Sequence, residues 1–393
     1  MPVLGLACLT FAAAALAIQI LSNGLAIRRC RRGRPAATAW QRPAVTLVRP
    51  LCGLEHFSRE TLESTFAIDY PGYEILFCVA DAGDPILPLL REIVATHPGR
   101  DARILVGDDA VGANPKLNNM AKGFRLSSHQ HIVFVDSNVF TPPDYLDQLA
   151  AALETGAGMV TAPPVGLAPT GFWAELECAF LNTYQARMQY AADTLGRGFA
   201  QGKTLFFRRA DLDHGGFAQL ASEPAEDAAA TKMMQARGLR IRLAGPFPQL
   251  VGPRTALQMW KRQVRWARLR RASFPQFFAP EILAGVLPPL AALAAGLCAL
   301  GLDAPLAAPA FVVLWYLPEL LLLRLAGWPR SLPALLLRDL MLPAVFIAGC
   351  AGSRFEWHGK PMTAARRTSE SPRLGRMHPR LIWARLASRN PFG

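Results

Sequence analysis

The stretch Ile132-Val133-Phe134-Val135-Asp136-Ser137-Asn138 decides the fold of this chain. Four apolar residues in a row are typical of a strand buried on both faces, and the polar tripeptide that follows ends it. Three similar apolar runs precede it, at residues 45–48, 74–79 and 103–106. The sequence therefore predicts a set of short strands, and this one carries polar groups at its carboxyl end.

Helical patterns separate these runs. We expect helices over residues 58–66, 84–96, 116–124 and 143–153, then a strand over 202–207 and a helix over 227–237. Strands that alternate with helices predict a parallel sheet covered on both faces. Ligands of such sheets bind at the carboxyl ends of the strands, where Asp81 and Asp136 are both expected. The predicted fold class is α/β, in a domain that covers residues 44–253.

The composition indicates membrane segments beside this globular part. Hydrophobic residues make up 51% of the 393 residues, and the mean hydropathy is +0.19, which is high for a soluble protein. The net charge of +13 suits a nucleic acid, an anionic membrane surface or anionic substrates. Because the basic residues cluster beside apolar runs, the membrane is favoured. Seven scattered cysteines without a Cys-X-X-Cys pair predict neither a disulfide framework nor a zinc site.

The first apolar segment predicts a membrane anchor. Residues 2–27 carry no charge and are long enough to cross a bilayer as a helix. An arginine cluster at residues 28–34 follows, which is the pattern of an uncleaved anchor whose carboxyl end faces the cytoplasm. We therefore expect a multi-pass membrane protein with its globular domain in the cytoplasm, as in a bacterial inner membrane.

Residues 282–352 are expected to hold two or three further spans. Residues 282–302 carry no charge and are long enough to cross a bilayer. The next two candidates are interrupted by Pro318-Glu319 and by Arg338-Asp339, and charges at membrane depth must be paired or face a cavity. The Arg338-Asp339 pair also fits a bend between an interfacial piece and a short span. Residues 353–393 form a basic tail that we expect to be poorly ordered.

Residues 254–275 predict an amphipathic helix at the membrane surface, because basic residues surround an apolar stripe at helical spacing. The stripe consists of Leu257, Trp260, Val264 and Ala267. The same helix contains Arg262, Arg265 and Trp266. Arginine binds phosphate through paired hydrogen bonds, and tryptophan stacks on a sugar or closes an acceptor channel. Membrane anchoring by the same side chains is the alternative interpretation.

Asp136 and Asn138 are candidate ligands of a divalent cation, Mg²⁺ or Mn²⁺. A carboxylate and an amide two positions apart at a strand end offer two oxygen ligands beside a diphosphate. The amide oxygen is the weaker ligand, and Asp-Ser-Asn is also an ordinary turn.

Three further segments carry candidate site residues. In residues 112–119 a Gly-X-Asn-Pro turn leads into a helix, and the free backbone amides at a helix start attract anions. In the same segment Lys116 adds a mobile positive charge for a diphosphate, and Asn118 adds amide hydrogen bonds. Asp81 follows a strand and is a candidate acceptor for the N3–H of uracil or for ribose hydroxyls. Asp227 at a predicted helix start is a candidate general base. Local helix capping is the alternative for both carboxylates.

Together these segments resemble the ceramide glucosyltransferase family, which is related to hopanoid-associated glycosyltransferases. The resemblance covers about residues 44–275 and the membrane arrangement, and its most specific part is Val-Gly-X-Asn-Pro-Lys-X-Asn-Asn at 111–119. The other resembling segments are residues 49–53, 69–74, 136–137, 225–227 and 262–266. The resemblance implies a GT-A type, Rossmann-like nucleotide-binding domain with flanking transmembrane helices, UDP-glucose as donor and ceramide as acceptor.

The resemblance also implies a role for each candidate. It assigns Asp81 to the uridine, Asp136 to the metal-diphosphate region and Asp227 to the catalytic base, with Arg262, Arg265 and Trp266 clamping diphosphate and acceptor. Asn138 departs from the family's tripeptide, which leaves metal dependence open. The alternatives are transfer of N-acetylglucosamine from its UDP donor to a hopanoid or other lipid, and a catalytically silent membrane scaffold. A nucleic-acid binder is disfavoured because no stacking aromatics interleave with the basic residues.

Overall fold

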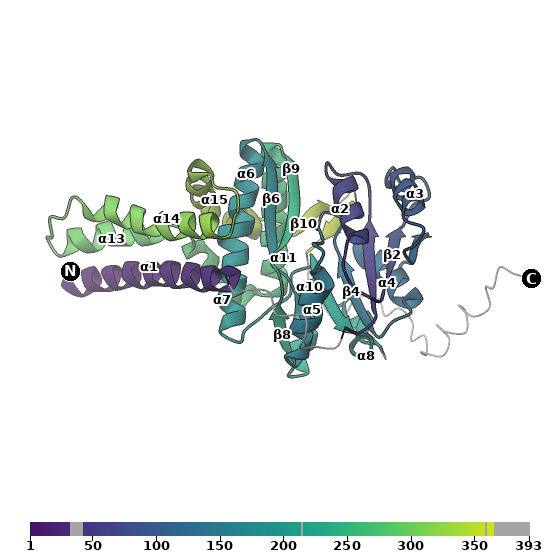
Figure 1. Cartoon of the computed structure of the whole chain (residues 1–393). Helices are drawn as coiled ribbons and strands as arrows, with labels where there is room; N and C mark the ends of the chain where they lie inside the picture. The colour runs from purple at the N-terminus through teal and green to yellow at the C-terminus, as the bar shows by residue number, and fades with distance from the viewer. Residues whose placement is uncertain (32–41, 214, 358–359, 365–393) are drawn as a thin grey trace, which may run out of the picture.

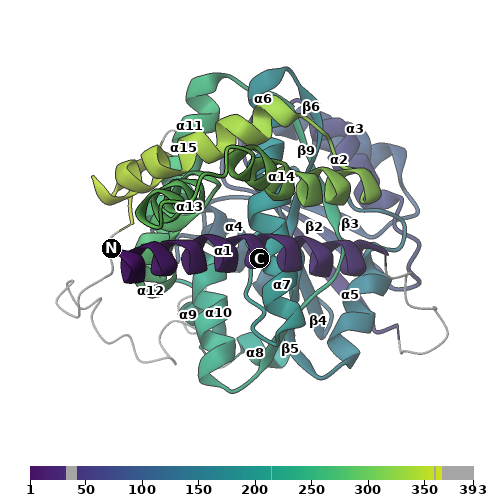
Figure 2. The ribbon, with the colours of Figure 1, turned by 90° about the vertical axis from the view of Figure 1, so that its left-hand side faces the viewer.

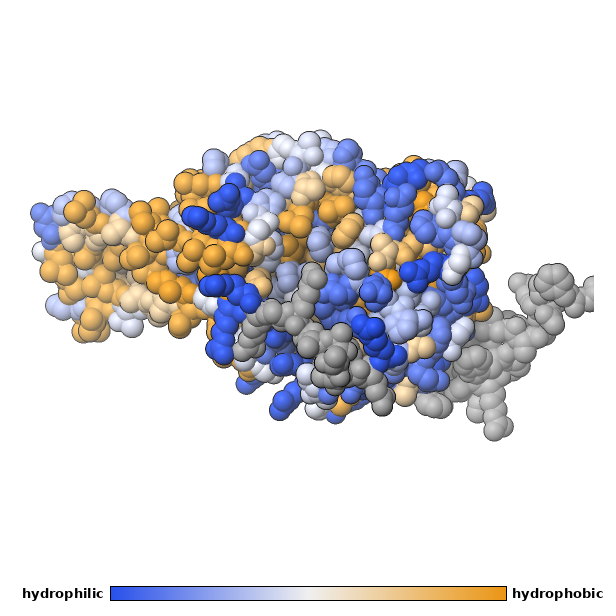
Figure 3. Space-filling view, viewed as in Figure 1, coloured by the Kyte–Doolittle hydropathy of each residue, from blue (hydrophilic) through white to orange (hydrophobic). Residues whose placement is uncertain are grey.

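The computed structural model describes residues 1–31, 42–213, 215–357 and 360–364. An α/β domain carries a group of apolar helices that project from one side of it (Figure 1). The projecting helices form the hydrophobic end of the surface, and the α/β domain forms the more hydrophilic end (Figure 3). The expectation of a globular domain beside membrane-type helices is therefore confirmed.

The central sheet has the strand order β3-β2-β1-β4-β7-β5-β8. Its strands in chain order are β1 (Val45–Leu51), β2 (Tyr73–Val79), β3 (Ala102–Val106), β4 (His131–Val135), β5 (Ala157–Thr161), β7 (Thr204–Arg208) and β8 (Arg240–Leu243). The first four are parallel, but β7 runs antiparallel to both of its neighbours, β4 and β5. The predicted parallel sheet is therefore found in the first four strands, and the antiparallel strand β7 makes the whole sheet mixed. The mixed sheet brings the start of β7 beside the carboxyl end of β4.

Helices cover both faces of this sheet, as predicted. They are α2 (Ser58–Phe66), α3 (Ile86–Thr96), α4 (Pro115–Leu126), α5 (Tyr145–Glu154), α8 (Arg209–Leu212), α9 (Gly216–Gln219) and α10 (Glu226–Ala236). Successive strand residues point to opposite faces. Leu47 accordingly packs in the core below α2, α3 and α5, and Val48 packs in the core below α4 and α10. Burial on both faces explains the continuous apolar runs in the sequence.

Local sequence fixes the position of α4 at the edge where β1 and β4 end. Asn114 caps the helix by accepting hydrogen bonds from the amides of Lys116 (3.0 Å) and Leu117 (3.3 Å), and Pro115 occupies the first turn. Gly123 lets α4 lie against the sheet, because a Cβ there would be 2.3 Å from a Val48 methyl group. The first turn of α4 therefore lies beside the end of β4.

A helical rod connects the α/β domain to the apolar helices. It consists of α6 (Phe172–Ala179), the π-helical turn η1 (Phe180–Ala186) and α7 (Arg187–Thr194), and it packs beside the parallel pair β6 (Pro164–Thr170) and β9 (Phe247–Pro253). The basic helix α11 (Ala256–Ser273) follows β9 and begins with a capping box between Thr255 and Gln258. It packs against α6 and α15.

The predicted apolar stripe of α11 is only partly correct. Val264 and Ala267 are buried as expected, but Leu257 is 60% exposed. Met259 and Gln263 are buried in addition. The buried face of α11 therefore differs from the predicted stripe and includes the polar side chains of Gln263 and Ser273.

Three of the described helices are long and apolar enough to cross a membrane: α1 (Pro2–Arg31), α14 (Ala307–Leu325) and α15 (Leu332–Cys350). Helix α1 contacts α13 (Leu287–Ala299) and α14, and these helices lie in front of the sheet in Figure 2. Pro318 and the Arg338-Asp339 pair lie within continuous helices, so the alternative of a bend at residues 338–339 does not apply.

The span predicted over residues 282–302 is not one straight helix. The helices α12 (Pro275–Phe278) and η2 (Ala279–Leu283) precede α13 at an angle of 52°, so this segment is a bent pair. The tail also begins differently, because β10 (Arg354–Trp357) and β11 (Lys360–Thr363) form an antiparallel hairpin. The rest of the predicted tail and the cluster residues Arg32 and Arg34 lie outside the described residues.

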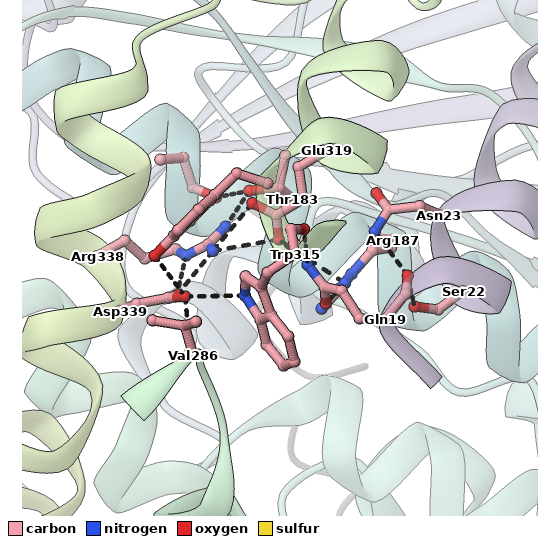
Figure 4. Close-up of polar contacts among 12 residues, drawn as sticks. Gln19, Ser22, Asn23, Thr183, Arg187, Val286, Trp315, Glu319, Arg338 and Asp339 are labelled. Carbon is pink, nitrogen blue, oxygen red and sulfur yellow. Dashed lines mark hydrogen bonds and ion pairs between the residues drawn. The ribbon is translucent and has the colours of Figure 1, made fainter. Parts of the chain in front are cut away.

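The buried charged residues of α7, α14 and α15 neutralise one another inside the helix bundle, because Arg187 and Arg338 face Glu319 and Asp339 (Figure 4). Arg338 pairs with Glu319 at 3.0 Å and with Asp339 at 2.7 Å. Asp339 also accepts hydrogen bonds from the amide of Val286 (3.0 Å) and the indole of Trp315 (3.1 Å). The expectation that charges at membrane depth are paired is thus confirmed.

Candidate active site

Asp136 lies at the carboxyl end of β4 between two lysines. Lys116 Nζ is 2.5 Å from its Oδ1, and Lys203 Nζ is 2.8 Å from its Oδ2. Burial alone would raise the pKa of Asp136, but the two ammonium groups outweigh burial and hold the pKa well below its ordinary value. Asp136 is therefore a permanent anion, and each of its oxygens has a cationic partner.

Lys116 connects the two sides of the site. Its ammonium contacts Asp136 at 2.5 Å, Glu226 Oε1 at 2.6 Å and the carbonyl oxygen of Gly202 at 2.6 Å. An ammonium has three N–H donors, so these three acceptors use all of them. The sequence predicted a mobile charge for a diphosphate, whereas the structure holds Lys116 as a fixed link between β4 and α10.

Lys203 lies on the other side of Asp136. Its ammonium also donates to Asn138 Oδ1 at 3.0 Å, and its carbonyl accepts a hydrogen bond from the Asp136 amide at 3.1 Å. Burial lowers the pKa of Lys203, and Arg262 and Lys116 add to this lowering because they place further positive charge nearby. An anion that arrived here would relieve this concentration of positive charge.

Asp227 lies in the first turn of α10. Its Oδ2 accepts a hydrogen bond from the Gly202 amide (2.9 Å), and its Oδ1 accepts one from the Ala228 amide (2.8 Å). Burial raises the pKa of Asp227 to about 6, and the neighbouring Glu226 charge adds to this effect. A carboxylate with a pKa near neutrality suits a general base at physiological pH.

The turn before α4 is held together by its own asparagines. Asn118 Oδ1 accepts hydrogen bonds from the amides of Val111 and Gly112, both at 3.0 Å. Asn114 Nδ2 donates to Glu226 Oε2 at 2.9 Å. Asn118 is predicted to add hydrogen bonds to the nucleotide sugar, and in the structure its side-chain oxygen holds the loop.

Asp81 lies apart from this group. It is exposed at the end of β2, which β1 separates from β4, and its Oδ1 accepts a hydrogen bond from the Gly83 amide at 2.9 Å. No hydrogen bond or ion pair in the described part of the chain joins Asp81 to Asp136 or Asp227. It lies at the predicted edge of the sheet with its carboxylate open to solvent.

The arginine-tryptophan motif on α11 is held by Glu177 of α6. This fully buried carboxylate pairs with Arg254 at 3.1 Å and with Arg262 at 3.3 Å. Arg262 also lies over the Trp266 ring, with its Cζ 4.8 Å from the ring centre.

The charge of this motif reaches the lysine site. Burial lowers the pKa of Arg265 to about 10; the positive charge of Arg262 lowers it further, while Glu177 and Asp136 oppose the shift. The charge of Arg262 also acts on Lys203. The motif and the Asp136 site therefore belong to one electrostatic environment.

The donor set does not fit a divalent cation in this arrangement. Both oxygens of Asp136 and the amide oxygen of Asn138 are already held by ammonium groups. Within residues 1–364, leaving aside the undescribed stretches, no group of three or more His, Cys, Asp or Glu side chains is placed to hold a metal ion. The metal role expected for Asp136 and Asn138 is thus not supported by their contacts.

Four residues of the site were not predicted from the sequence. Gly202 and Lys203 lie in the turn directly before the antiparallel strand β7, and Glu177 lies on α6. Arg49 is fully buried and donates a hydrogen bond to the carbonyl oxygen of Val139 at 2.6 Å. It therefore holds the turn that begins at Asp136. The charge of Arg49 and Glu177 inside apolar segments was the only local signal for these two residues.

Comparison with known proteins places the chain among glycosyltransferases. The model of glycosyl transferase family 21 matches residues 7–369. Ceramide glucosyltransferase 1 of Caenorhabditis elegans is 30% identical over 245 residues, which cover 61% of this chain and 53% of that protein. Ceramide glucosyltransferase 3 of the same species is 26% identical over 327 residues, 80% of this chain and 71% of that protein. The chain thus spans about half the length of the first of these relatives.

Among solved structures, a mannosyltransferase from Pyrobaculum calidifontis in complex with GDP-Man and Mn²⁺ is 21% identical, with a TM-score of 0.45. The match covers 87% of this chain and 97% of that one. The family match confirms the resemblance found in the sequence, and the structure confirms an α/β domain flanked by apolar helices. Because the family model matches nearly the whole length, the chain belongs to glycosyl transferase family 21.

Proposed function

We propose that this chain transfers glucose from UDP-glucose to the primary hydroxyl of ceramide, with inversion at the anomeric carbon. The observation that carries the proposal is the convergence of Asp227 and Asp136 on one group. Lys116 contacts Asp136 directly, and its third acceptor, Gly202, binds the Asp227 carboxylate through its amide. A base and a cluster of cations therefore lie side by side, as a reaction that removes a proton and releases a diphosphate requires.

In the proposed reaction Asp227 takes the proton of the ceramide hydroxyl while the hydroxyl oxygen forms its bond to the anomeric carbon. The bond from that carbon to the β-phosphate oxygen breaks, and its electron pair leaves with UDP. Negative charge grows on the diphosphate during this step. The guanidinium groups of Arg262 and Arg265, with the ammonium groups around Asp136, stabilise that charge.

The remaining candidates receive roles around this centre. Asp81 is proposed to bind the uridine, because its exposed carboxylate lies at the same edge of the sheet as Asp136. Trp266 is proposed to border the acceptor channel, because it lies on α11, which packs against the membrane-type helix α15. Lys116 and Asn118 position these groups rather than touch the donor. No step of this mechanism depends on a bound metal.

A lipid acceptor agrees with the position of the site. A two-chain lipid does not leave the bilayer readily, so its hydroxyl must be reached at the headgroup level. The basic helix α11 connects the end of β9 to the apolar helices, which is where such a surface is expected. We propose that the α/β domain faces the cytoplasm, because UDP-sugars would then reach Asp81 directly and the arginines in the last turn of α1 would obey the positive-inside tendency.

The test is an assay of the purified full chain with radiolabelled UDP-glucose and ceramide in lipid vesicles. We expect labelled glucosylceramide, identified by mass spectrometry. Asp227→Asn should lower the rate by about 10²- to 10⁴-fold, the usual contribution of a general base. The matched control is Asp213→Asn, a partly exposed carboxylate on the far side of β7, which should retain the rate.

Two outcomes contradict the proposal in different ways. Transfer from UDP-N-acetylglucosamine to a hopanoid, with no transfer to ceramide, would replace both substrates and keep the mechanism. Binding of UDP without transfer to any lipid would indicate a silent scaffold.

A further inference from the structure

The two oxygens that the sequence offers to a metal ion share one cationic partner. Lys203 Nζ is 2.8 Å from Asp136 Oδ2 and 3.0 Å from Asn138 Oδ1. These atoms are the carboxylate and the amide predicted as metal ligands. The ammonium of Lys203 therefore lies at the position between them that a bound cation would take.

Lys203 differs from Lys116 in its remaining capacity to donate. Lys116 gives its three N–H groups to Asp136, Glu226 and the Gly202 carbonyl. Lys203 gives two, to Asp136 and Asn138, and among the described residues its third N–H has no acceptor. Of the two lysines, Lys203 is the one that can bind an additional oxygen without losing a partner.

Lys203 is also held in place more firmly than a surface lysine. It directly precedes β7, whose first residue Thr204 pairs with Val135 of β4. Its carbonyl accepts the Asp136 amide at 3.1 Å, and its side chain is only 15% exposed. Backbone and side chain therefore fix the same ammonium beside the same carboxylate. Such pre-organisation is what a group that stabilises growing charge needs.

We propose that the ammonium of Lys203, rather than a divalent cation, neutralises the donor diphosphate at Asp136 and Asn138. This inference rests on the proposed nucleotide-sugar function, and it identifies the Lys203 ammonium as the positive charge that neutralises the donor diphosphate. A diphosphate oxygen accepts the third N–H of Lys203, and UDP binding and sugar transfer then proceed without added metal. Asp136 serves as the anchor that holds the two lysines, and it is not a metal ligand.

The decisive measurement is UDP binding to the full chain by titration calorimetry, in excess EDTA and in Mn²⁺. We expect the same affinity in both buffers for the wild-type protein. Lys203→Met keeps the length of the side chain and removes the charge, so UDP affinity in EDTA should fall by about tenfold or more, the value of one charge-assisted hydrogen bond. Lys261→Met, an exposed lysine on α11, is the matched control and should bind UDP as the wild type does.

Mn²⁺ binding, followed by electron paramagnetic resonance, provides a readout that is independent of turnover. Because UDP itself chelates Mn²⁺, this titration is done without UDP, and the wild-type protein should leave Mn²⁺ free. Lys203→Met should bind it, because the oxygens of Asp136 and Asn138 are then released. If the wild-type protein binds UDP only with Mn²⁺, the inference is overturned whether or not the variant folds.

The inference and the proposed function fail in distinguishable ways. Equal UDP binding in EDTA and Mn²⁺ supports the role of Lys203 even if ceramide is not the acceptor. Metal-dependent UDP binding together with glucosylceramide formation would refute the role of Lys203 and leave the proposed function intact. If the protein bound UDP in neither buffer, both would be refuted.

Discussion

The amide of Gly202 donates a hydrogen bond of 2.9 Å to Oδ2 of Asp227, and it does so from the centre of the site. The carbonyl of the same residue accepts from Lys116 at 2.6 Å. One peptide segment therefore orients both the proposed base and the lysine that anchors Asp136. The close packing around Gly202 makes this relationship sensitive to a single methyl group.

Gly202→Ala should lower activity while preserving the fold. A Cβ at this position would lie 2.8 Å from Glu226 Oε1 and 3.1 Å from Lys116 Nζ, so these groups must shift. A displacement of about 1 Å in a catalytic group typically costs about 10²-fold in rate. The measurement is kcat/KM with UDP-glucose and ceramide. Gly99→Ala, with no atom within 4 Å of its Cβ, is the control, and equal losses in both variants would count against a positioning role.

The rate should depend on the protonation state of Asp227. Its raised pKa of about 6 means that the base is protonated and inactive below that pH. We expect kcat/KM to rise with pH through about 6 and to level off above it, because kcat/KM follows ionisation in the free enzyme. The stability of the protein should depend on pH in the opposite direction. The pKa of Asp227 is higher in the folded protein than its value of about 4 in the unfolded chain, so protonated Asp227 favours the folded state. This contribution to the free energy of unfolding is complete below pH 4 and is lost as the pH rises through 6. A rate that is flat from pH 5 to 8 would exclude Asp227 as the base.

Glu177→Gln should weaken donor binding more than it slows the chemical step. The substitution keeps the size of the side chain but removes the charge that pairs with Arg254 and Arg262. Without this charge Arg262 loses its orientation over Trp266, and we expect KM for UDP-glucose to rise about tenfold. Glu177→Asp, which restores the charge, should recover part of the loss. The control is Glu175→Gln on the same helix, and an unchanged KM in Glu177→Gln would remove Glu177 from the site.

The buried charges of α14 and α15 should matter for stability. Arg338→Met removes the cationic partner of Asp339 and leaves Glu319 only Arg187, at 3.7 Å. Breaking a buried pair in this way costs about 3–5 kcal/mol. We expect a marked drop in the thermal unfolding midpoint of the protein in detergent micelles. The double variant Arg338→Met/Glu319→Gln should lose less than the single one, because one uncompensated charge is also removed. If the loss in the double variant equalled the sum of the losses in the two single variants, Arg338 and Glu319 would act independently and the prediction would fail.

Local sequence patterns were sufficient to predict most individual elements. The range predicted for α2 coincides with the observed one, and the first four strands and the helices between them fall within a few residues of their predicted bounds. The apolar segments that were predicted as membrane helices form the helices that project from the α/β domain. These features depend on side-chain spacing and on the residues at helix ends, which neighbouring residues in the chain decide.

The candidate site was predicted only in part, for a physical reason. Asp136, Asn138, Lys116 and Asp227 were found because each follows a strand or opens a helix. Lys203 has no such local mark, and it meets Asp136 only because β7 pairs antiparallel with β4. Lys116 was recognised, but its three fixed acceptors come from segments up to 110 residues away.

The sequence by itself determined the α/β class, the short strands, the apolar helices and the family resemblance, because these follow from periodicity, capping and composition. Tertiary structure alone decided the strand order, the bent pair before α13, the neutral charge cluster in the helix bundle and the partner of each lysine. Those features are contacts between residues distant in the chain, and such contacts depend on how whole elements pack. A pattern read along the sequence does not contain that information.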